Sequence, residues 1–215
     1  MSPTLKTELS RVQWPAYYLD FETVMTALPL YPDTAPYTQV PTQYSVHICS
    51  ALGKVVTHKE FLAPDPTKDC RRLLAEQLVA DLGSQGSVLA YHAAFKSTVI
   101  KNLAAMYPDL APSLNAIIAR MLDLEAFVLG GFYHPRFHGS SSIKVVLPVM
   151  VPTMSYSGLA IGDGDAAVAQ FARMAKGQCG VEESKELRKA LLTYCEQDTL
   201  AMVKLHEQLI AYATD

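Results

Sequence analysis

The chain has 215 residues, a formal net charge of -3 at pH 7 and a hydrophobic content of 50%. This length is sufficient for one well-buried domain and short for two, so we predict a single domain over residues 1–215. The slightly acidic balance argues against a protein that holds a long nucleic acid by bulk electrostatic attraction. It does not exclude a protein that binds a few terminal nucleotides through metal ions.

The N-terminal segment MSPTLKTELSRVQWP lacks the apolar core of a signal peptide. No stretch approaches the roughly 18 uninterrupted apolar residues of a membrane span. The cysteines have neither the paired spacing of a zinc site nor the density of a disulfide framework. We therefore expect a soluble, cytoplasmic protein with reduced thiols and no membrane partner. The cysteines are Cys49, Cys70, Cys179 and Cys195.

The first part of the chain is expected to form three strands. An apolar run over 16–22 indicates a buried strand, and the prolines between it and Pro41 exclude a continuous helix, so this segment is expected to be a loop. The β-branched stretches at 42–52 and 54–63, on either side of Gly53, predict a hairpin.

Helices and shorter strands are expected to follow. Apolar residues at helical spacing predict a helix that begins near Thr67 or Asp69, either a suitable N-cap, and ends at Gly83. A short strand at 87–92 is expected to lead into a helix over 95–106. Such strand-to-helix junctions often carry active-site residues in open α/β sheets.

The last third is expected to be mainly helical. We predict a short strand before Asp123, a helical turn after it and a loop over 130–142. The segment 143–152 is helix-like but is expected to be broken by Pro148 and Pro152. Two further helices are predicted, over 163–174 and over 182–212, and the second has a broad apolar stripe.

Asp20 and Glu22 lie two residues apart in the first strand, so both carboxylates leave the same face. Their neighbours are aromatic or aliphatic, which indicates a buried strand. Two acids in a buried strand are costly unless a cation or another partner compensates their charge. This pair therefore suggests a metal site, although an Asp-x-Glu pair at a solvated strand end is the alternative.

Tyr194 and Asp198 are four residues apart in the last predicted helix, so they project from one face on successive turns. Together with Asp20 and Glu22 they supply three carboxylates and a phenol, which is what a folded two-metal site requires. Taken alone, Tyr194 and Asp198 are also compatible with an ordinary exposed helix face.

The order of these features resembles a known family. A strand with Asp-x-Glu, a hairpin, a helix, a strand, a helix and a late helix with Tyr-x-x-x-Asp is similar to the DEDD (DnaQ-like) 3′-5′ exonucleases of the ribonuclease H-like superfamily, in the subclass whose last motif carries tyrosine. The resemblance covers nearly the whole chain. YLDFET, VPTQYSVHI, GSSSIKVVLP and YCEQDT further resemble an uncharacterised bacterial domain family often joined to nuclease modules.

The resemblance implies an α/β fold with a ribonuclease H-like mixed sheet flanked by helices. It implies that Asp20 bridges two divalent ions, that Glu22 binds the first ion and helps to place the attacking water, and that Asp198 completes the shell of that ion. Tyr194 is implied to orient or activate the water. Ligation by oxygen suits Mg2+ or Mn2+ better than zinc.

One position departs from the family pattern. The second motif of such exonucleases reads Asn-x-x-x-Asp, whereas the aligned residues here are His92 and Lys96. An ammonium group there repels a metal ion by on the order of several kcal/mol. Three outcomes are open: Lys96 turns into solvent while Asp123 supplies the missing carboxylate, Lys96 replaces the second ion as a fixed charge, or catalysis is lost. His92 either contacts the substrate near the reacting group or is a buried histidine at a strand end.

The loop over 130–142 offers further candidates for substrate binding. Tyr133 and Phe137 are the preferred residues for stacking on unpaired bases, although aromatic residues of this kind mostly serve packing. Arg136 and Lys144 are candidates for contacts with the nucleic-acid backbone, and solvated surface positions are the alternative.

The leading prediction is a metal-dependent 3′-5′ exonuclease that hydrolyses terminal phosphodiesters of single-stranded DNA or RNA by a two-metal mechanism. The alternative is a catalytically impaired nucleic-acid-binding domain that serves a larger nuclease or helicase system, because Lys96 occupies the position of the third acid. A third hypothesis is an interaction module in which the acids hold a structural ion.

Overall fold

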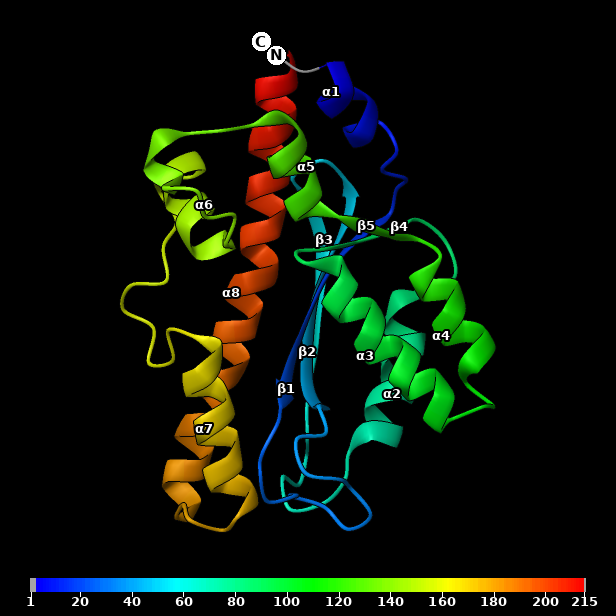
Figure 1. Ribbon diagram of the computed structural model, residues 1–215, viewed down its shortest axis with the longest axis vertical. Coiled ribbons are helices and arrows are strands. Elements are labelled where there is room, and N and C mark those ends of the chain that lie inside the picture. The colour runs from blue at the N-terminus through cyan, green and yellow to red at the C-terminus, as the bar shows by residue number, and fades with distance from the viewer. Residues whose placement is uncertain (1–2, 215) are drawn as a thin grey trace.

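The computed structural model describes residues 3–214 and shows an α/β fold built on one mixed sheet (Figure 1). The sheet has five strands in the order β3-β2-β1-β4-β5. β1 pairs antiparallel with β2 and parallel with β4, so the central strand joins a hairpin to a parallel half. The strands are β1 (Ala16–Val24), β2 (Val40–Ala51), β3 (Lys54–Leu62), β4 (Ser87–Ala90) and β5 (Met121–Asp123).

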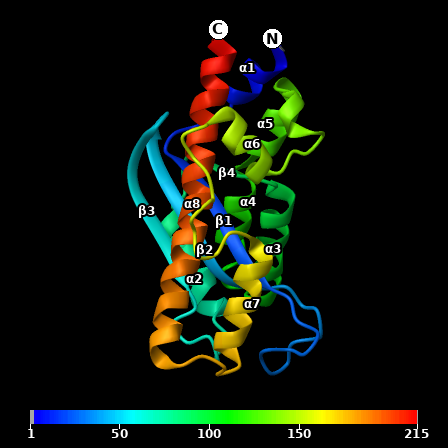
Figure 2. The ribbon, with the colours of Figure 1, turned by 90° about the vertical axis from the view of Figure 1, so that its left-hand side faces the viewer.

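Helices cover both faces of this sheet. α2, α3 and α4 pack on one face, and the long α8 crosses the other face in contact with β1, β2 and β3 (Figures 1 and 2). The helices are α1 (Pro3–Leu9), α2 (Arg71–Leu82), α3 (Ala93–Met106), α4 (Ala111–Ile118), α5 (Leu124–Gly131), α6 (Ile143–Met150), α7 (Gly164–Ala175) and α8 (Val181–Thr214), with a 3₁₀ turn at Pro135–Phe137. No helix in residues 3–214 is long and apolar enough to cross a membrane.

The side chains of β1 alternate between two hydrophobic clusters, because successive residues of a strand point to opposite faces. Leu19 and Phe21 are buried in the cluster that also contains Leu74 and Leu78 of α2. Tyr18 is buried in a second cluster with residues of α8. Asp20 and Glu22 share the face of Tyr18, so the fold turns both carboxylates towards α8.

Several sequence predictions agree with the structure, and others need correction. The hairpin, the short strand before Asp123 and the helix that follows it are present. The second helix, however, begins at Arg71 rather than at Thr67 or Asp69. Asp69 lies two residues before this start, and its carboxylate accepts from the Arg71 backbone N–H at 3.0 Å, as a capping side chain does, and also pairs with the Arg71 guanidinium. It therefore holds Arg71 from outside the helix.

Three helical features depart from the predicted pattern. The lead-in forms α1, and α4 follows α3, although neither was expected. Pro148 lies inside α6 and does not break it, and the helix ends at Met150. A proline in this position removes one backbone hydrogen bond, but burial of Val146, Leu147 and Met150 offsets the loss.

Candidate metal centre

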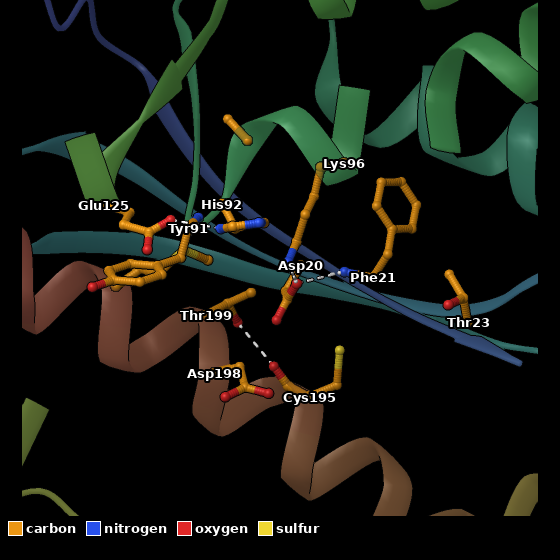
Figure 3. Close-up of polar contacts among 12 residues, drawn as sticks. Asp20, Phe21, Thr23, Tyr91, His92, Lys96, Glu125, Cys195, Asp198 and Thr199 are labelled. Atoms are coloured by element: carbon orange, nitrogen blue, oxygen red, sulfur yellow. Dashed lines mark hydrogen bonds and ion pairs between the residues drawn. The ribbon is translucent and has the colours of Figure 1, made fainter. Parts of the chain in front are cut away.

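Three carboxylates from the two ends of the chain meet on the α8 face of the sheet. Asp20 and Glu22 come from β1 and Asp198 comes from α8, and each offers a ligand oxygen within 4.8 Å of the others. Figure 3 shows Asp20 and Asp198 facing one another across the space between strand and helix. The structure thus brings together the acids that the sequence analysis singled out.

Their hydrogen bonds leave oxygens free for a cation. Asp20 Oδ1 accepts from the Phe21 N–H at 2.9 Å, and Asp198 Oδ1 accepts from the Tyr156 hydroxyl at 2.6 Å. Within residues 3–214 the Glu22 carboxyl group has no hydrogen bond or ion pair, and the Oδ2 atoms of Asp20 and Asp198 have none. An all-oxygen donor set of this kind fits a hard divalent cation such as Mg2+ or Mn2+.

The electrostatics of the cluster also favour a bound cation. Burial, followed by the charges of Asp20 and Asp198, raises the pKa of Glu22 to about 9. Burial and the nearby Asp20 likewise raise the pKa of Asp198 to about 7. Crowded carboxylates in a poorly solvated place repel one another, so a bound divalent cation would relieve this repulsion.

Lys96 of α3 lies in this cluster and is turned away from solvent. Its Nζ is 2.7 Å from Asp20 Oδ1, and its side chain is 12% exposed (Figure 3). Burial lowers the pKa of Lys96, but the Asp20 carboxylate outweighs burial and the net shift is upward. The ammonium therefore stays charged beside Asp20, and the expectation that Lys96 turns into solvent is wrong.

Asp123 does not replace the missing acid. Its Oδ2 accepts from the Ala93 N–H and its Oδ1 from the Glu125 N–H, each at 3.0 Å. The carboxylate thus caps α5 and ties it to the start of α3. With both oxygens engaged, Asp123 stands outside the carboxylate cluster among the residues that the structure describes.

Tyr194 lies behind the carboxylates and is only 4% exposed. Its hydroxyl accepts from Lys144 Nζ at 3.0 Å, and the same ammonium donates to the Gly162 carbonyl at 3.0 Å. Burial, followed by the Asp198 charge, raises the pKa of Tyr194, so the phenol keeps its proton. Lys144, expected at the surface as a backbone contact, is instead a partner of this tyrosine.

A cavity of about 480 Å³ opens beside the cluster and is lined in part by Asp20, Lys96 and Asp198. Glu22 and Tyr194 are not among its lining residues, so they act on this space only through their neighbours. The remaining lining residues come from the turn between β4 and α3, from α5, from the segment before α6, and from α6 and α8: Tyr91, His92, Glu125, Ser140, Ser141, Ser142, Ile143 and Met202.

Glu125 organises the far wall of this cavity and was missed by sequence reasoning. Its carboxylate lies 2.6 Å from His92 Nδ1 and accepts from Ser141 Oγ at 2.6 Å. The Tyr91 hydroxyl donates to the Ser141 carbonyl, which fixes the serine segment against β4. His92 has a 68% exposed side chain, so the alternative of a buried histidine is wrong.

The candidates in the loop over 130–142 lie elsewhere. Phe137 is buried, with its ring 5.8 Å from that of Phe132, so the expectation that it stacks on a base is wrong. Tyr133 is 73% exposed, but neither it nor the exposed Arg136 lines the cavity. Tyr156, which binds Asp198, was also missed, because no spacing in the sequence links it to the acids.

The fold and this centre define an α/β protein whose acidic cluster suits a hard divalent cation. The chain belongs to the family described as "Domain of unknown function (DUF2779)", which matches residues 17–142. The matched region contains Asp20, Glu22 and Lys96, whereas Asp198 lies beyond it.

Curated relatives are similar over most of the chain. The chain is 28% identical over 210 residues to an "Uncharacterized protein MG366 homolog" of Mycoplasma pneumoniae, which covers 87% of this chain and 31% of the relative. It is 24% identical over 208 residues to "Uncharacterized protein UU173" of Ureaplasma parvum, covering 86% of this chain and 30% of the relative. The chain thus spans about a third of the length of these relatives. No solved structure matches it.

Proposed function

We propose that this protein is a metal-dependent nuclease of ribonuclease H-like fold, which removes nucleotides from the 3′ ends of single-stranded DNA or RNA. The observation that carries the proposal is the meeting of Asp20, Glu22 and Asp198 beside an open cavity. The order of elements supports it, because a strand with two acids, a hairpin, a helix, a strand, a helix and a late helix with an acid is the order on which the resemblance rests.

The three carboxylates would hold Mg2+ or Mn2+ through the oxygens that they leave free. When bound, such an ion activates water and neutralises charge on a phosphodiester during in-line attack. Asp198 is oriented for this role by the hydroxyl of Tyr156, and Asp20 by the backbone N–H of Phe21. Both carboxylates are thereby fixed before any ligand arrives, as preorganised catalysis requires.

Lys96 takes the part that a second ion has in the two-metal mechanism. Its ammonium lines the cavity and is held by Asp20, so it presents a fixed positive charge where a phosphate oxygen would enter. A charge that is already desolvated and positioned needs no reorganisation during the reaction. Tyr194 and Lys144 act differently from the implied pattern, because their mutual hydrogen bond makes them positioning residues behind the carboxylates.

The proposal is tested with 5′-labelled single-stranded DNA and RNA in Mg2+ or Mn2+. The wild-type protein should shorten the labelled strands from the 3′ end, and Asp20→Asn and Asp198→Asn should each lower the rate at least about 100-fold. Asp165→Asn is the matched control, because Asp165 is an exposed acid of α7 and should leave the rate unchanged. Absence of shortening with both metals and both substrates would refute the proposal.

A second candidate function rests on the same lysine. If Lys96 blocks a required ion, the protein is a catalytically impaired domain that binds single-stranded ends for a larger nuclease or helicase system. The two functions differ in the response to substitution. Lys96→Met should lower an existing activity if the ammonium works in the site, whereas Lys96→Asp should raise activity if the ammonium only blocks it. Binding of labelled strands by both variants provides the control for a retained fold.

A further inference from the structure

A second group of metal-ligating side chains lies on the hairpin, apart from the three carboxylates. It consists of His47 of β2, His58 of β3 and Glu196 of α8, and each offers a ligand atom within 4.8 Å of the others. His47 and His58 are direct cross-strand partners in the β2-β3 ladder, and their ring centroids are 4.6 Å apart. Figure 2 shows α8, which carries Glu196, running along this hairpin.

A chain of hydroxyl groups occupies one nitrogen of each ring. Thr199 Oγ1 donates to the Glu196 carbonyl at 3.0 Å, a bond that uses its one proton. With its proton placed on the helix backbone, this hydroxyl accepts from His47 Nδ1 at 2.8 Å and from Ser45 Oγ at 2.8 Å. Since Ser45 has used its proton on Thr199, its oxygen accepts from His58 Nε2 at 2.8 Å.

This assignment leaves a lone pair on His47 Nε2 and on His58 Nδ1. His58 Nδ1 also lies 3.9 Å from Glu196 Oε1, so a lone pair and a carboxylate oxygen face one another. Among the described residues neither nitrogen has a hydrogen-bond donor.

We propose that His47, His58 and Glu196 bind a zinc ion or a chemically similar transition metal, with water in the remaining position. Two imidazoles and one carboxylate are a donor set that zinc favours, whereas Mg2+ favours oxygen alone. Hydrogen bonds from the second ring nitrogens to hydroxyl groups orient both imidazoles, as outer partners commonly do at metal sites. The metal preference of this site therefore differs from that of the carboxylate cluster.

The exposure of the ligand side chains would allow a metal ion to enter and the ligands to close around it. The side chain of Glu196 is 48% exposed and that of His58 is 22% exposed, whereas His47 is buried. Ligand atoms of a tetrahedral zinc site lie about 3.4 Å apart, given zinc to ligand distances of about 2.1 Å. Glu196 is the most exposed of the three, and a change of its rotamer would bring its carboxylate to the two rings.

Binding at this site would join the hairpin to α8. Asp20 is the cross-strand partner of Ser45, and Asp198 lies two residues beyond Glu196 on α8. A metal held by both elements would fix the position of α8 over β1 and β2. The zinc-type ion would then help to position the carboxylates. The proposal of this site does not depend on whether the protein has nuclease activity.

The test is a titration with Co2+, whose visible absorption reports nitrogen and carboxylate ligands, followed by competition with Zn2+. The protein carries the substitutions Asp20→Asn and Asp198→Asn, so that the carboxylate cluster does not contribute. One Co2+ should bind per chain with tetrahedral absorption, and Zn2+ should displace it. His58→Gln and Glu196→Gln should each weaken binding at least tenfold.

His138→Asn is the matched control, because this exposed histidine lies outside the cluster and should leave Co2+ binding unchanged. Circular dichroism in the presence of a chelator checks that each variant is folded. Because the tested histidine and glutamate are partly exposed, folded variants are expected. No tetrahedral Co2+ absorption, or absorption that folded His58→Gln and Glu196→Gln variants retain in full, would overturn the proposal.

Discussion

His206 of α8 is a buried histidine away from both clusters. Its Nδ1 is hydrogen-bonded to the Tyr18 hydroxyl at 2.8 Å, and the residue is 1% exposed. Its Nε2 has no hydrogen-bond partner within the described residues. Burial lowers the pKa of His206 to about 4, so the imidazole is neutral at pH 7. The folded protein thus tolerates this ring only in its uncharged form.

We predict that His206 makes the protein sensitive to acid. Between its unfolded pKa of 6.5 and its folded pKa of about 4, the unfolded chain binds a proton that the folded chain does not. The free energy of unfolding therefore falls as the pH is lowered through this window, by up to about 3 kcal/mol. His206→Gln should remove this part of the loss in urea unfolding at pH 7.5, 6.5, 5.5 and 4.5.

His138→Asn, which changes an exposed histidine, should keep the wild-type dependence on pH. An unchanged pH dependence in His206→Gln would contradict the prediction. The difference between variant and wild type is the useful quantity, because other acids and histidines titrate in both proteins alike.

At the scale of elements, the start of β4 depends on one glycine. Gly86 has φ +80, and a Cβ atom built there would lie 1.8 Å from the Pro15 carbonyl oxygen. The next residue, Ser87, pairs with Ala16 at the start of β1. The close approach of these two backbone segments therefore sets the register of the parallel strands.

We predict that Gly86→Ala destabilises the protein by about 3 kcal/mol or more, because backbone strain and a backbone clash act together. Gly139→Ala is the matched control, since Gly139 also has φ +80 but has no atom within 4 Å of the added Cβ. It should cost only about 1 kcal/mol. Chemical denaturation measures both, and equal losses would show that the contact with Pro15 has no effect.

Much of the fold could be predicted from the sequence because the elements have strong local signals. The hairpin has β-branched runs around Gly53, and the last helix has a long apolar stripe. α4 was missed although Pro112 near its start is a favourable helix signal, and Leu114 and Ile117 are buried at helical spacing. Element ends also differed by a residue or two, as at α2, which begins at Arg71, two residues after Asp69.

The candidate site was predictable only in part. Asp20 and Asp198 could be selected from their residue type and their spacing to Glu22 and Tyr194. The side chain of Lys96 points towards Asp20 because of how α3 packs, which no sequence pattern indicates. His47 and His58 are equally far in sequence from the turn at residues 52 and 53, so the hairpin register could have paired them. That Glu196 joins these histidines could be seen only once the path of α8 over the hairpin was known.

At the scale of the whole molecule, the carboxylate cluster joins β1 to α8, which belong to opposite ends of the sequence. An ion bound there would contact only the folded chain, because Asp20 and Asp198 are far apart in the unfolded chain. Binding should therefore raise stability by mass action.

We predict that Mn2+ at about 100 times its dissociation constant adds about 2.7 kcal/mol to the free energy of unfolding. For a chain of this size, this corresponds to a rise in Tm of about 5–10 °C. Thermal unfolding should show this rise in the wild type and in Asp165→Asn but not in Asp198→Asn. An equal rise in Asp198→Asn would place the stabilising ion elsewhere.

The position of α8 after all the strands in the sequence has a consequence for synthesis on the ribosome. The strands that carry Asp20, Glu22, His47 and His58 emerge first, while α8 contains Asp198, Glu196 and Thr199. Neither cluster can assemble until α8 has left the exit tunnel and docked on the sheet. Translation that stops before α8 would therefore yield strands with exposed acids and histidines, and neither of the two proposed sites.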